Sequence, residues 1–181
     1  MAITKIWSVK SRLDTSLKYI ANPDKTTLQP DIEAVEGVIK YIKNNDKTEQ
    51  CKYVKAYNCT VDKAFSEMME TQEFFGKAGR KNSVLAYHLV QSFKDFETTP
   101  EIAHKCGLEL AERLFADKYE VVVATHLDHE HLHNHIIINA VSYLDGYKYR
   151  NNFKDYFIDI RGISDQICIE NCLSVIEHPK R

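Results

Sequence analysis

The feature that most constrains the fold is a pair of apolar stretches joined by a very short polar turn. Residues 119–127 read YEVVVATHL and residues 131–144 read HLHNHIIINAVSYL, with only three residues between them. A parallel pair of strands needs a crossover of a dozen or more residues, so two strands joined by so short a turn must be antiparallel. The sequence therefore predicts an antiparallel hairpin in the second half of the chain.

The remaining pattern alternates helices with strands. Strands are expected at residues 2–9, 53–59 and 83–93, and helices at residues 14–21, 32–42, 60–75, 99–116 and 154–175. This order, together with an antiparallel hairpin, predicts an α+β fold, in which a central antiparallel β-sheet is covered on one face by helices. No linker or repeat interrupts the chain, so residues 1–181 are expected to form a single domain.

Composition excludes several classes of protein. Hydrophobic residues make up 44% of the chain and charged residues 28%, which is typical of a globular protein. The net charge of −2 excludes a general polycation but allows a local basic patch. No apolar run approaches the ~18 residues that span a bilayer, and the N-terminus lacks the apolar segment of a secretory signal. Five cysteines, an odd number, fit reduced thiols, so we expect a cytoplasmic protein. We also expect a monomer without membrane insertion.

Five of the eight histidines fall in the predicted hairpin. With the turn centred between residues 129 and 130, residues whose numbers sum to 259 face each other, so His126 lies opposite His133. Opposed Cβ atoms are ~5 Å apart and next-but-one neighbours on a strand ~7 Å apart. The imidazoles of His126, His133 and His135 can therefore converge on one metal ion.

Other residues of this segment share the same face of the hairpin. His131 lies ~13 Å along the strand from His135, so it is expected beside the ligands or facing a substrate, or else in place of His126. Asp128 is placed to accept a hydrogen bond from a ligand histidine, and Asn139 points to the same side.

Three neutral nitrogen ligands leave coordination positions open, which suits a catalytic site better than a structural one. Such an ion needs anionic partners from its substrate, and a phosphate is the natural candidate. The competing interpretation is a solvated histidine-rich turn that binds metal adventitiously. Alternating histidines on a strand whose other face carries Ile136 and Ile138 argue against it.

The histidine segment resembles a known family. His133-Asn134-His135, behind His126-Leu127-Asp128, resembles the HUH signature of conjugative relaxases. The third motif of the relaxase/mobilization nuclease family, H-x-D-x-x-H-x-H-x-H-x-x-x-N, is matched at positions 126, 128, 131, 133, 135 and 139. The resemblance implies a palm-like HUH fold. Family members generally continue well past this length, so the chain is expected to be the catalytic portion alone, without their C-terminal regions.

The resemblance also implies a nucleophile. Tyr19 matches the N-terminal tyrosine of the family's first motif, although its setting near the end of a short amphipathic helix equally fits a core residue. Family relaxases use this tyrosine, with Mn²⁺ or Mg²⁺, to cut single-stranded DNA at an origin of transfer. A 5′-phosphotyrosyl link forms, and the ends are later rejoined. Asp128 is a candidate base for Tyr19. The implied partners are single-stranded and hairpin origin DNA and accessory relaxosome proteins.

Two further segments are candidates for DNA contacts. AYHLVQSF resembles the family's second motif: His88 and Ser92 share one face of the strand and Gln91 lies on the other, and the sequence does not choose between the faces. Basic side chains could contact phosphates or simply be solvated surface: Lys77, Arg80, Lys81, Lys148 and Arg150.

Two alternatives to a conjugative or mobilization relaxase are kept. A rolling-circle replication initiator would share the HUH chemistry, but such initiators usually carry the tyrosine after the histidine pair, whereas Tyr19 precedes it. A non-catalytic metal- or DNA-binding module would leave Tyr19 in the core.

Overall fold

The structure, a computed structural model, describes residues 2–10, 39, 53–78, 83–127, 131–152 and 154–176. The helices expected at 14–21 and, apart from Ile39, at 32–42 lie outside these residues. So do four candidate site residues: Tyr19, Arg80, Lys81 and Asp128.

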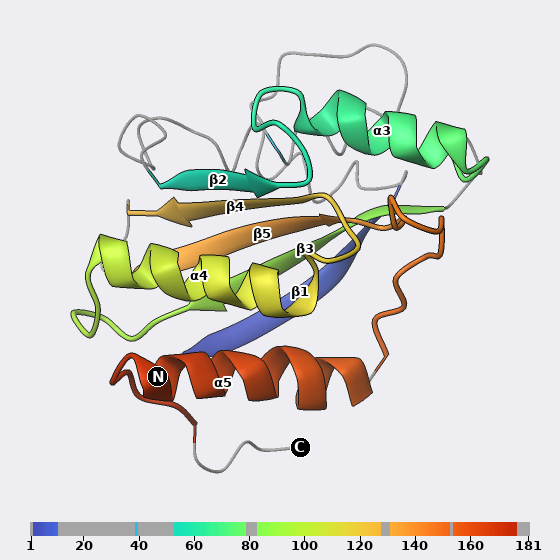
Figure 1. Cartoon of the computed structure of the whole chain (residues 1–181). Helices are drawn as coiled ribbons and strands as arrows, with labels where there is room; N and C mark the ends of the chain where they lie inside the picture. The colour runs from blue at the N-terminus through green and yellow to red at the C-terminus, as the bar shows by residue number, and fades with distance from the viewer. Residues whose placement is uncertain are drawn as a thin grey trace, which may run out of the picture.

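The described strands form one antiparallel sheet in the order β1-β3-β5-β4-β2 (Figure 1). Its strands are β1 (Ile3–Lys10), β2 (Val54–Tyr57), β3 (Val84–Ser92), β4 (Val121–His126) and β5 (His133–Asn139). All four pairs of neighbours are antiparallel. The central antiparallel sheet and the β4–β5 hairpin are therefore confirmed, and the expected strands differ from the observed ones mainly at their ends.

In the part of the chain that the structure describes, the α-helices that accompany the sheet are α3 (Ala64–Phe74), α4 (Pro100–Leu114) and α5 (Arg161–Glu170). The hydroxyl of Thr99 caps α4 by accepting a hydrogen bond from the backbone N–H of Ile102. The helix expected at 154–175 is instead a π-helical segment η1 (Asp155–Ile160) followed by α5. No helix within the described residues is long and apolar enough to cross a membrane.

Helices pack on both faces of the sheet, so the expectation of a single covered face is wrong. On one face, α4 and α5 pack on a core that includes Leu89, Val123 and Ile136. On the other, Met68 of α3 packs with Val122 and Ile137. Every residue of β4 and β5 is buried. The run of three isoleucines in β5 is the pattern of a strand covered on both sides.

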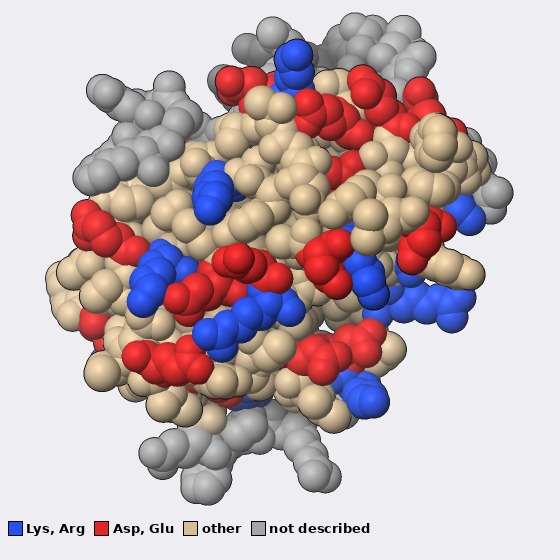
Figure 2. All heavy atoms as spheres, viewed as in Figure 1, with Lys and Arg blue, Asp and Glu red and all other residues tan. Residues whose placement is uncertain are grey.

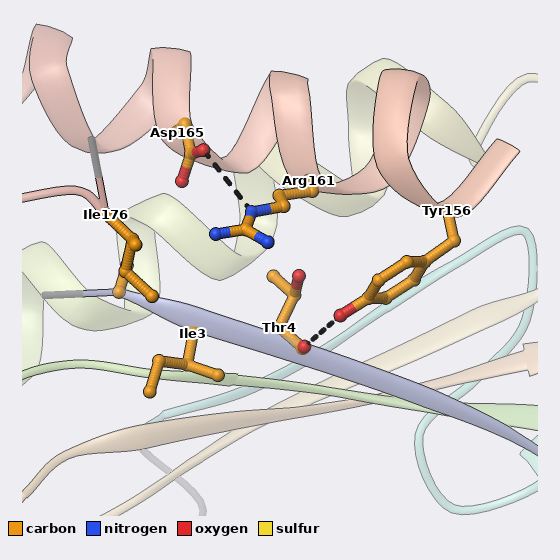
Figure 3. Close-up of a pocket in the computed structure, with 7 residues that line it drawn as sticks. Ile3, Thr4, Tyr156, Arg161, Asp165 and Ile176 are labelled. Atoms are coloured by element: carbon orange, nitrogen blue, oxygen red, sulfur yellow. Dashed lines mark hydrogen bonds and ion pairs between the residues drawn. The ribbon is translucent and has the colours of Figure 1, made fainter. Parts of the chain in front are cut away.

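The edge strand β1 is joined to α5 and η1 by a polar seam (Figure 3). The hydroxyl of Tyr156 donates to the backbone carbonyl of Thr4, and Arg161 lies 3.8 Å from Asp165 one helical turn along. These residues line a small pocket with Ile3 and Ile176, among others. The Tyr156 hydrogen bond links η1 to β1, which pairs along its length with β3 and borders the site described below.

A buried chain of hydrogen bonds holds β5 against its neighbours on the α4 face. Asn134 donates from Nδ2 to the side-chain oxygen of Gln91 (2.9 Å) and to the carbonyl of Ala103 (2.7 Å). Its Oδ1 accepts from the hydroxyl of Thr125 at 2.6 Å. One amide thus connects β3, β4, β5 and α4. Because buried polar groups must be paired, this network disfavours any other register of β5.

Gly107 in the middle of α4 allows this network to form. A Cβ added there would lie 2.5 Å from Nδ2 of Asn134. We expect Gly107→Ala to lower the free energy of unfolding by about 1–3 kcal/mol through overpacking, although alanine is the better helix former. Chemical denaturation measures this change.

Gly162 provides the matched control, since it is also helical but exposed, and the nearest atom to an added Cβ is 4.0 Å away. Gly162→Ala should leave stability unchanged or raise it by up to about 1 kcal/mol. Equal effects of the two substitutions would contradict the role given to Gly107.

Candidate metal centre

The candidate centre lies where β4 ends and β5 begins. His126 is paired with His133, and Ala124 with His135. The register inferred from the length of the turn is therefore confirmed. Side chains alternate along each strand, so all three histidines project from the face that α3 partly covers.

The three imidazoles meet within the protein. One ring nitrogen from each of His126, His133 and His135 lies within 4.8 Å of the other two. The ring centroids of His126 and His135 are 4.3 Å apart, and those of His133 and His135 4.9 Å. His126 is fully buried, while His133 and His135 are 9% and 7% exposed. Clustered imidazoles repel one another when protonated and contribute little as packing groups.

The donor set fits a divalent ion. Bonds from a metal such as zinc to imidazole nitrogen are ~2.0–2.1 Å, and imidazole nitrogens are common ligands of such ions. The three donor nitrogens lie within 4.8 Å of one another. The Nδ1 atom of His133 lies 3.3 Å from the carbonyl oxygen of His131, which can only accept. Nδ1 must therefore carry the proton, and Nε2 of a neutral His133 is left to bind.

His88 of β3 supports the cluster from the side. Its Nε2 lies 2.8 Å from Nδ1 of His135, so a proton on His135 Nδ1 can be donated to it. Burial, and secondarily the nearby charge of His126, lowers the pKa of His88 to about 3. A neutral His88 can accept this bond and so direct Nε2 of His135 toward the cluster, as outer partners of ligand histidines commonly do.

Within the described residues, His126, His133 and His135 form the group within ligand distance; His131 is outside it, although its ring centroid lies 5.9 Å from that of His133. His131 is exposed, and its ring lies 3.7 Å from the carboxylate of Asp95. The sequence had left either residue as the third member of the cluster. Ser92, opposite His133 on β3, lies on the cluster face and is half-buried.

Gln91 and Asn139, candidates for supporting the ligands or positioning DNA, lie away from the cluster. Gln91 is fully buried on the α4 and α5 face, where its amide nitrogen donates to Ser164. Asn139 is on the cluster face but lies at the other end of β5, fully buried beneath α3. Its amide donates to Glu120 and accepts from Gln72. Both amides satisfy buried polar groups and have no free path to a substrate.

The described basic candidates lie toward the opposite end of the sheet. Lys77 follows the end of α3 that packs near Asn139, and Lys148 donates to Ser83 and to the carbonyl of Val84 at the start of β3. The exposed Arg150 comes two residues later in the chain. Their predicted phosphate contacts are therefore not near the histidines.

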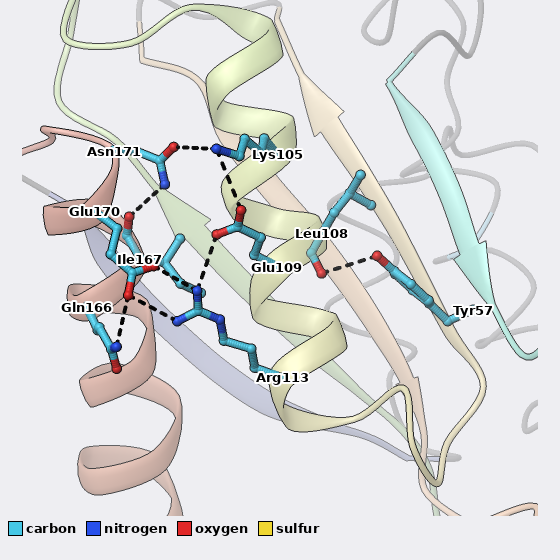
Figure 4. A network of polar contacts seen from close by, with 9 residues as sticks. All are labelled: Tyr57, Lys105, Leu108, Glu109, Arg113, Gln166, Ile167, Glu170 and Asn171. Atoms are coloured by element: carbon cyan, nitrogen blue, oxygen red, sulfur yellow. Dashed lines mark hydrogen bonds and ion pairs between the residues drawn. The ribbon is translucent and has the colours of Figure 1, made fainter.

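The helical face offers no concentrated positive charge either. Acidic and basic side chains alternate over α4 and α5 (Figure 2). The ion pairs there include Arg113 with Glu170 at 2.7 Å and Lys105 with Glu109 at 3.7 Å (Figure 4). With opposite charges already paired, this surface is poorly suited to a phosphate backbone.

Sequence reasoning missed Trp7. It lies opposite His88 in the β1–β3 pair, with ring centroids 4.4 Å apart, and it is 40% exposed. Alternation along residues 2–9 places it on one face of a strand, but only the pairing of β1 with β3 identifies that face as the histidine face.

Comparisons with known proteins identify a family. Residues 41–173 match the family model of the relaxase nuclease domain, MobA/VirD2-like. Protein rlx of Staphylococcus aureus is 43% identical over 123 residues, which are 67% of this chain and 36% of that protein. The group II intron-interrupted relaxase LtrB of Lactococcus lactis is 33% identical over 141 residues, covering 77% of this chain and 25% of that protein.

The fold has a solved counterpart. A structure reported as the molecular basis of vancomycin resistance transfer in Staphylococcus aureus aligns with a TM-score of 0.55 at 12% identity. The alignment covers 97% of this chain and 96% of that chain.

An antiparallel sheet that gathers three histidines at one hairpin is the arrangement expected of an HUH-type nuclease domain. The chain belongs to the MobA/VirD2-like relaxase family, through its nuclease domain. Relaxases of this family generally use a divalent metal, and the buried histidine triad could bind one. The chain spans 36% of the length of the first curated relatives it matches.

Metal binding should stabilise the protein. At an Mn²⁺ concentration about 100 times Kd, we expect stabilisation of about 2.7 kcal/mol and a rise in Tm of about 5–10 °C. His126→Ala, His133→Ala and His135→Ala should each remove most of this shift, while His131→Ala should keep it. Thermal denaturation with and without Mn²⁺ measures the shift. Loss of the shift in His131→Ala together with its survival in His126→Ala would contradict the triad.

His104 should make stability depend on pH. Its Nδ1 lies 2.8 Å from the hydroxyl of Thr125, and burial, then the charge of Lys55, lowers the pKa of His104 to about 4. An unfolded histidine titrates near 6.5. Between about 6.5 and about 4 the unfolded chain binds the extra proton, so the free energy of unfolding falls as pH falls through this interval.

The matched variant is His104→Gln, which keeps a hydrogen-bonding side chain but cannot titrate. Chemical denaturation across this pH interval should give a flatter dependence for His104→Gln than for the wild type. The lowered pKa of His88 also makes the free energy of unfolding fall as pH falls, in the wild type and in His104→Gln alike. Some pH dependence of stability should therefore remain in the variant. Identical slopes would contradict the assignment to His104.

Proposed function

We propose that this chain is the catalytic domain of a relaxase. It would cut one strand of DNA at an origin of transfer and later rejoin it, for conjugative transfer or mobilization of a plasmid or transposon. The observation that carries the proposal is the convergence of His126, His133 and His135 at the β4–β5 hairpin, in a chain of the relaxase family. The names of the relatives, Rlx and relaxase LtrB, agree with it.

The histidine triad would hold a divalent ion, for which Mn²⁺ or Mg²⁺ is our proposal. When bound, such an ion supplies positive charge that polarises phosphoryl oxygens and stabilises charge developing during transfer. His88 would keep Nε2 of His135 turned toward that position. Ser92, beside His133, is the residue of the second motif best placed to contact the substrate.

Tyr19 is the proposed nucleophile, by its match to the family's first motif. Its phenolic oxygen would attack the phosphorus of one phosphodiester, and the bond from phosphorus to the 3′ oxygen would break. The phenolic proton would pass to a base, with Asp128 as the candidate, and the departing 3′ oxygen would take up a proton. Because the phosphotyrosyl ester conserves the energy of the phosphodiester, the reverse attack by a 3′-OH would reseal the strand without ATP.

The proposed substrate is single-stranded DNA flanked by a hairpin at an origin of transfer. Accessory relaxosome proteins would present this DNA to a monomeric nuclease domain. The exposed face of the sheet beside the triad, and not the charge-paired surface of α4 and α5, would receive the strand.

A covalent-adduct assay tests the proposal. Incubating the protein with single-stranded candidate origin DNA and Mn²⁺ should give a protein–DNA band on denaturing gels. Tyr19→Phe and EDTA should each abolish the band. His88→Ala should reduce its rate of formation by about 10- to 100-fold, as expected for an outer partner of a metal ligand, and His135→Ala by more.

Tyr147→Phe provides the matched control, because Tyr147 is 75% exposed and follows β5 at the end away from the triad. It should leave the band unchanged. DNA affinity should be largely kept in the histidine variants, since backbone charge contacts dominate binding. Binding without an adduct at every origin sequence would support the alternative of a non-catalytic DNA-binding module.

A further inference from the structure

The face that carries the triad continues across β3 to the edge strand β1. Ser92 is paired with both His133 and Ile3, and Val90 with both His135 and Lys5. Opposed residues on neighbouring strands have Cβ atoms ~5 Å apart. The side chains of β1 are therefore the direct lateral continuation of the metal centre.

This continuation is open to solvent. Ile3 and Trp7 are 46% and 40% exposed, and Lys5 between them is exposed. On β3, Val90 and Ser92 are half-buried. We call Ile3, Lys5 and Trp7 the β1 strip. The β1 strip thus exposes an apolar, a cationic and an aromatic side chain to solvent. The histidines of the neighbouring centre, by contrast, are almost fully buried.

Among the described residues, the ring of Trp7 packs on His88. Its ring meets that of His88 at a centroid distance of 4.4 Å and an interplanar angle of 48°, and His88 in turn contacts His135. The exposed part of the indole is a rigid aromatic surface next to the centre. Covering the exposed part of this indole with a partner would be favourable, because an aromatic side chain gains free energy by burial.

We propose that Trp7 stacks on a nucleobase of single-stranded DNA, next to the phosphodiester held at the histidine centre. Lys5 would contact the backbone of the same strand. This inference rests on the proposed function and names a residue that positions its substrate. Unpaired bases stack on exposed aromatic rings regardless of sequence, whereas the bases of a duplex are already stacked. The strip is therefore selective for an unpaired strand.

The chain contains a single tryptophan, so tryptophan fluorescence reports on the surroundings of Trp7. In EDTA, where cutting is suppressed, a short single-stranded oligonucleotide at low salt should quench the emission of Trp7. The corresponding duplex should quench it much less. A tryptophan that only packs on His88 would not respond to DNA.

Affinity measurements with a labelled oligonucleotide complete the test. Trp7→Ala should weaken single-strand binding at least about fivefold, and Trp7→Phe, which keeps an aromatic face, should lose less. Phe74→Ala is the matched control, because Phe74 is 83% exposed at the end of α3 remote from the triad. It should bind as the wild type does, and thermal denaturation checks that all variants are folded.

The outcomes separate this inference from the proposed function. Unquenched emission with wild-type affinity in Trp7→Ala would overturn the role of Trp7 and leave the relaxase proposal standing. Quenching and weakened binding in a protein that forms no covalent adduct would support the role of Trp7 and count against the nuclease. Failure to bind single-stranded DNA at all would overturn both.

Discussion

The pairing of His126 with His133 across the β4–β5 hairpin is the contact on which the site depends. A short turn brings two residues seven positions apart to opposed places in a ladder, and the next residue on the same face of β5, His135, completes the triad. No loop has to close over the ion and no distant element has to dock for the donors to meet. The geometry follows from the alternation of side chains along each strand. It also follows from the sheet, in which β4 and β5 each have a neighbouring strand on both sides.

The residue between the two histidines of β5 has the opposite task. Asn134 points away from the triad and bonds to Gln91, Thr125 and the backbone of α4. Neighbouring polar residues at the start of β5, His133 and Asn134, therefore act in two different ways. Imidazoles on one face can engage an ion, while an amide on the other holds the strand in register.

Much of the sheet and of the triad could be predicted because both follow from local periodicity. The hairpin register needed only the length of the turn, and the convergence of His126, His133 and His135 followed from it. A helix was expected at residues 60–75, but its position on the second face of the sheet was not. The run of isoleucines in β5 indicates burial on both faces without indicating which element covers each face. The positions of Gln91 and Asn139 could not be predicted for a related reason: a sequence does not distinguish a polar side chain that meets a substrate from one that satisfies buried polar groups.

What the sequence could not supply was the pairing between distant strands. Trp7 and His88 are far apart along the chain, and only the β1–β3 register makes them neighbours. The same holds for Gly107, whose lack of a side chain becomes meaningful only when α4 lies against Asn134. Tyr19 remains a prediction from the family motif.

Consecutive residues of β5 face opposite sides of the sheet, and this alternation also limits how the strand can change during evolution. Single substitutions on one face leave the other face in place, so catalytic and supporting residues can vary separately. Adding or removing one residue within β5 is different, because it exchanges the two faces: the amide would enter the imidazole cluster, and the histidines would be driven into the apolar layer beneath α4. Length variation among such domains is therefore expected in the connecting loops, and this strand should keep its length.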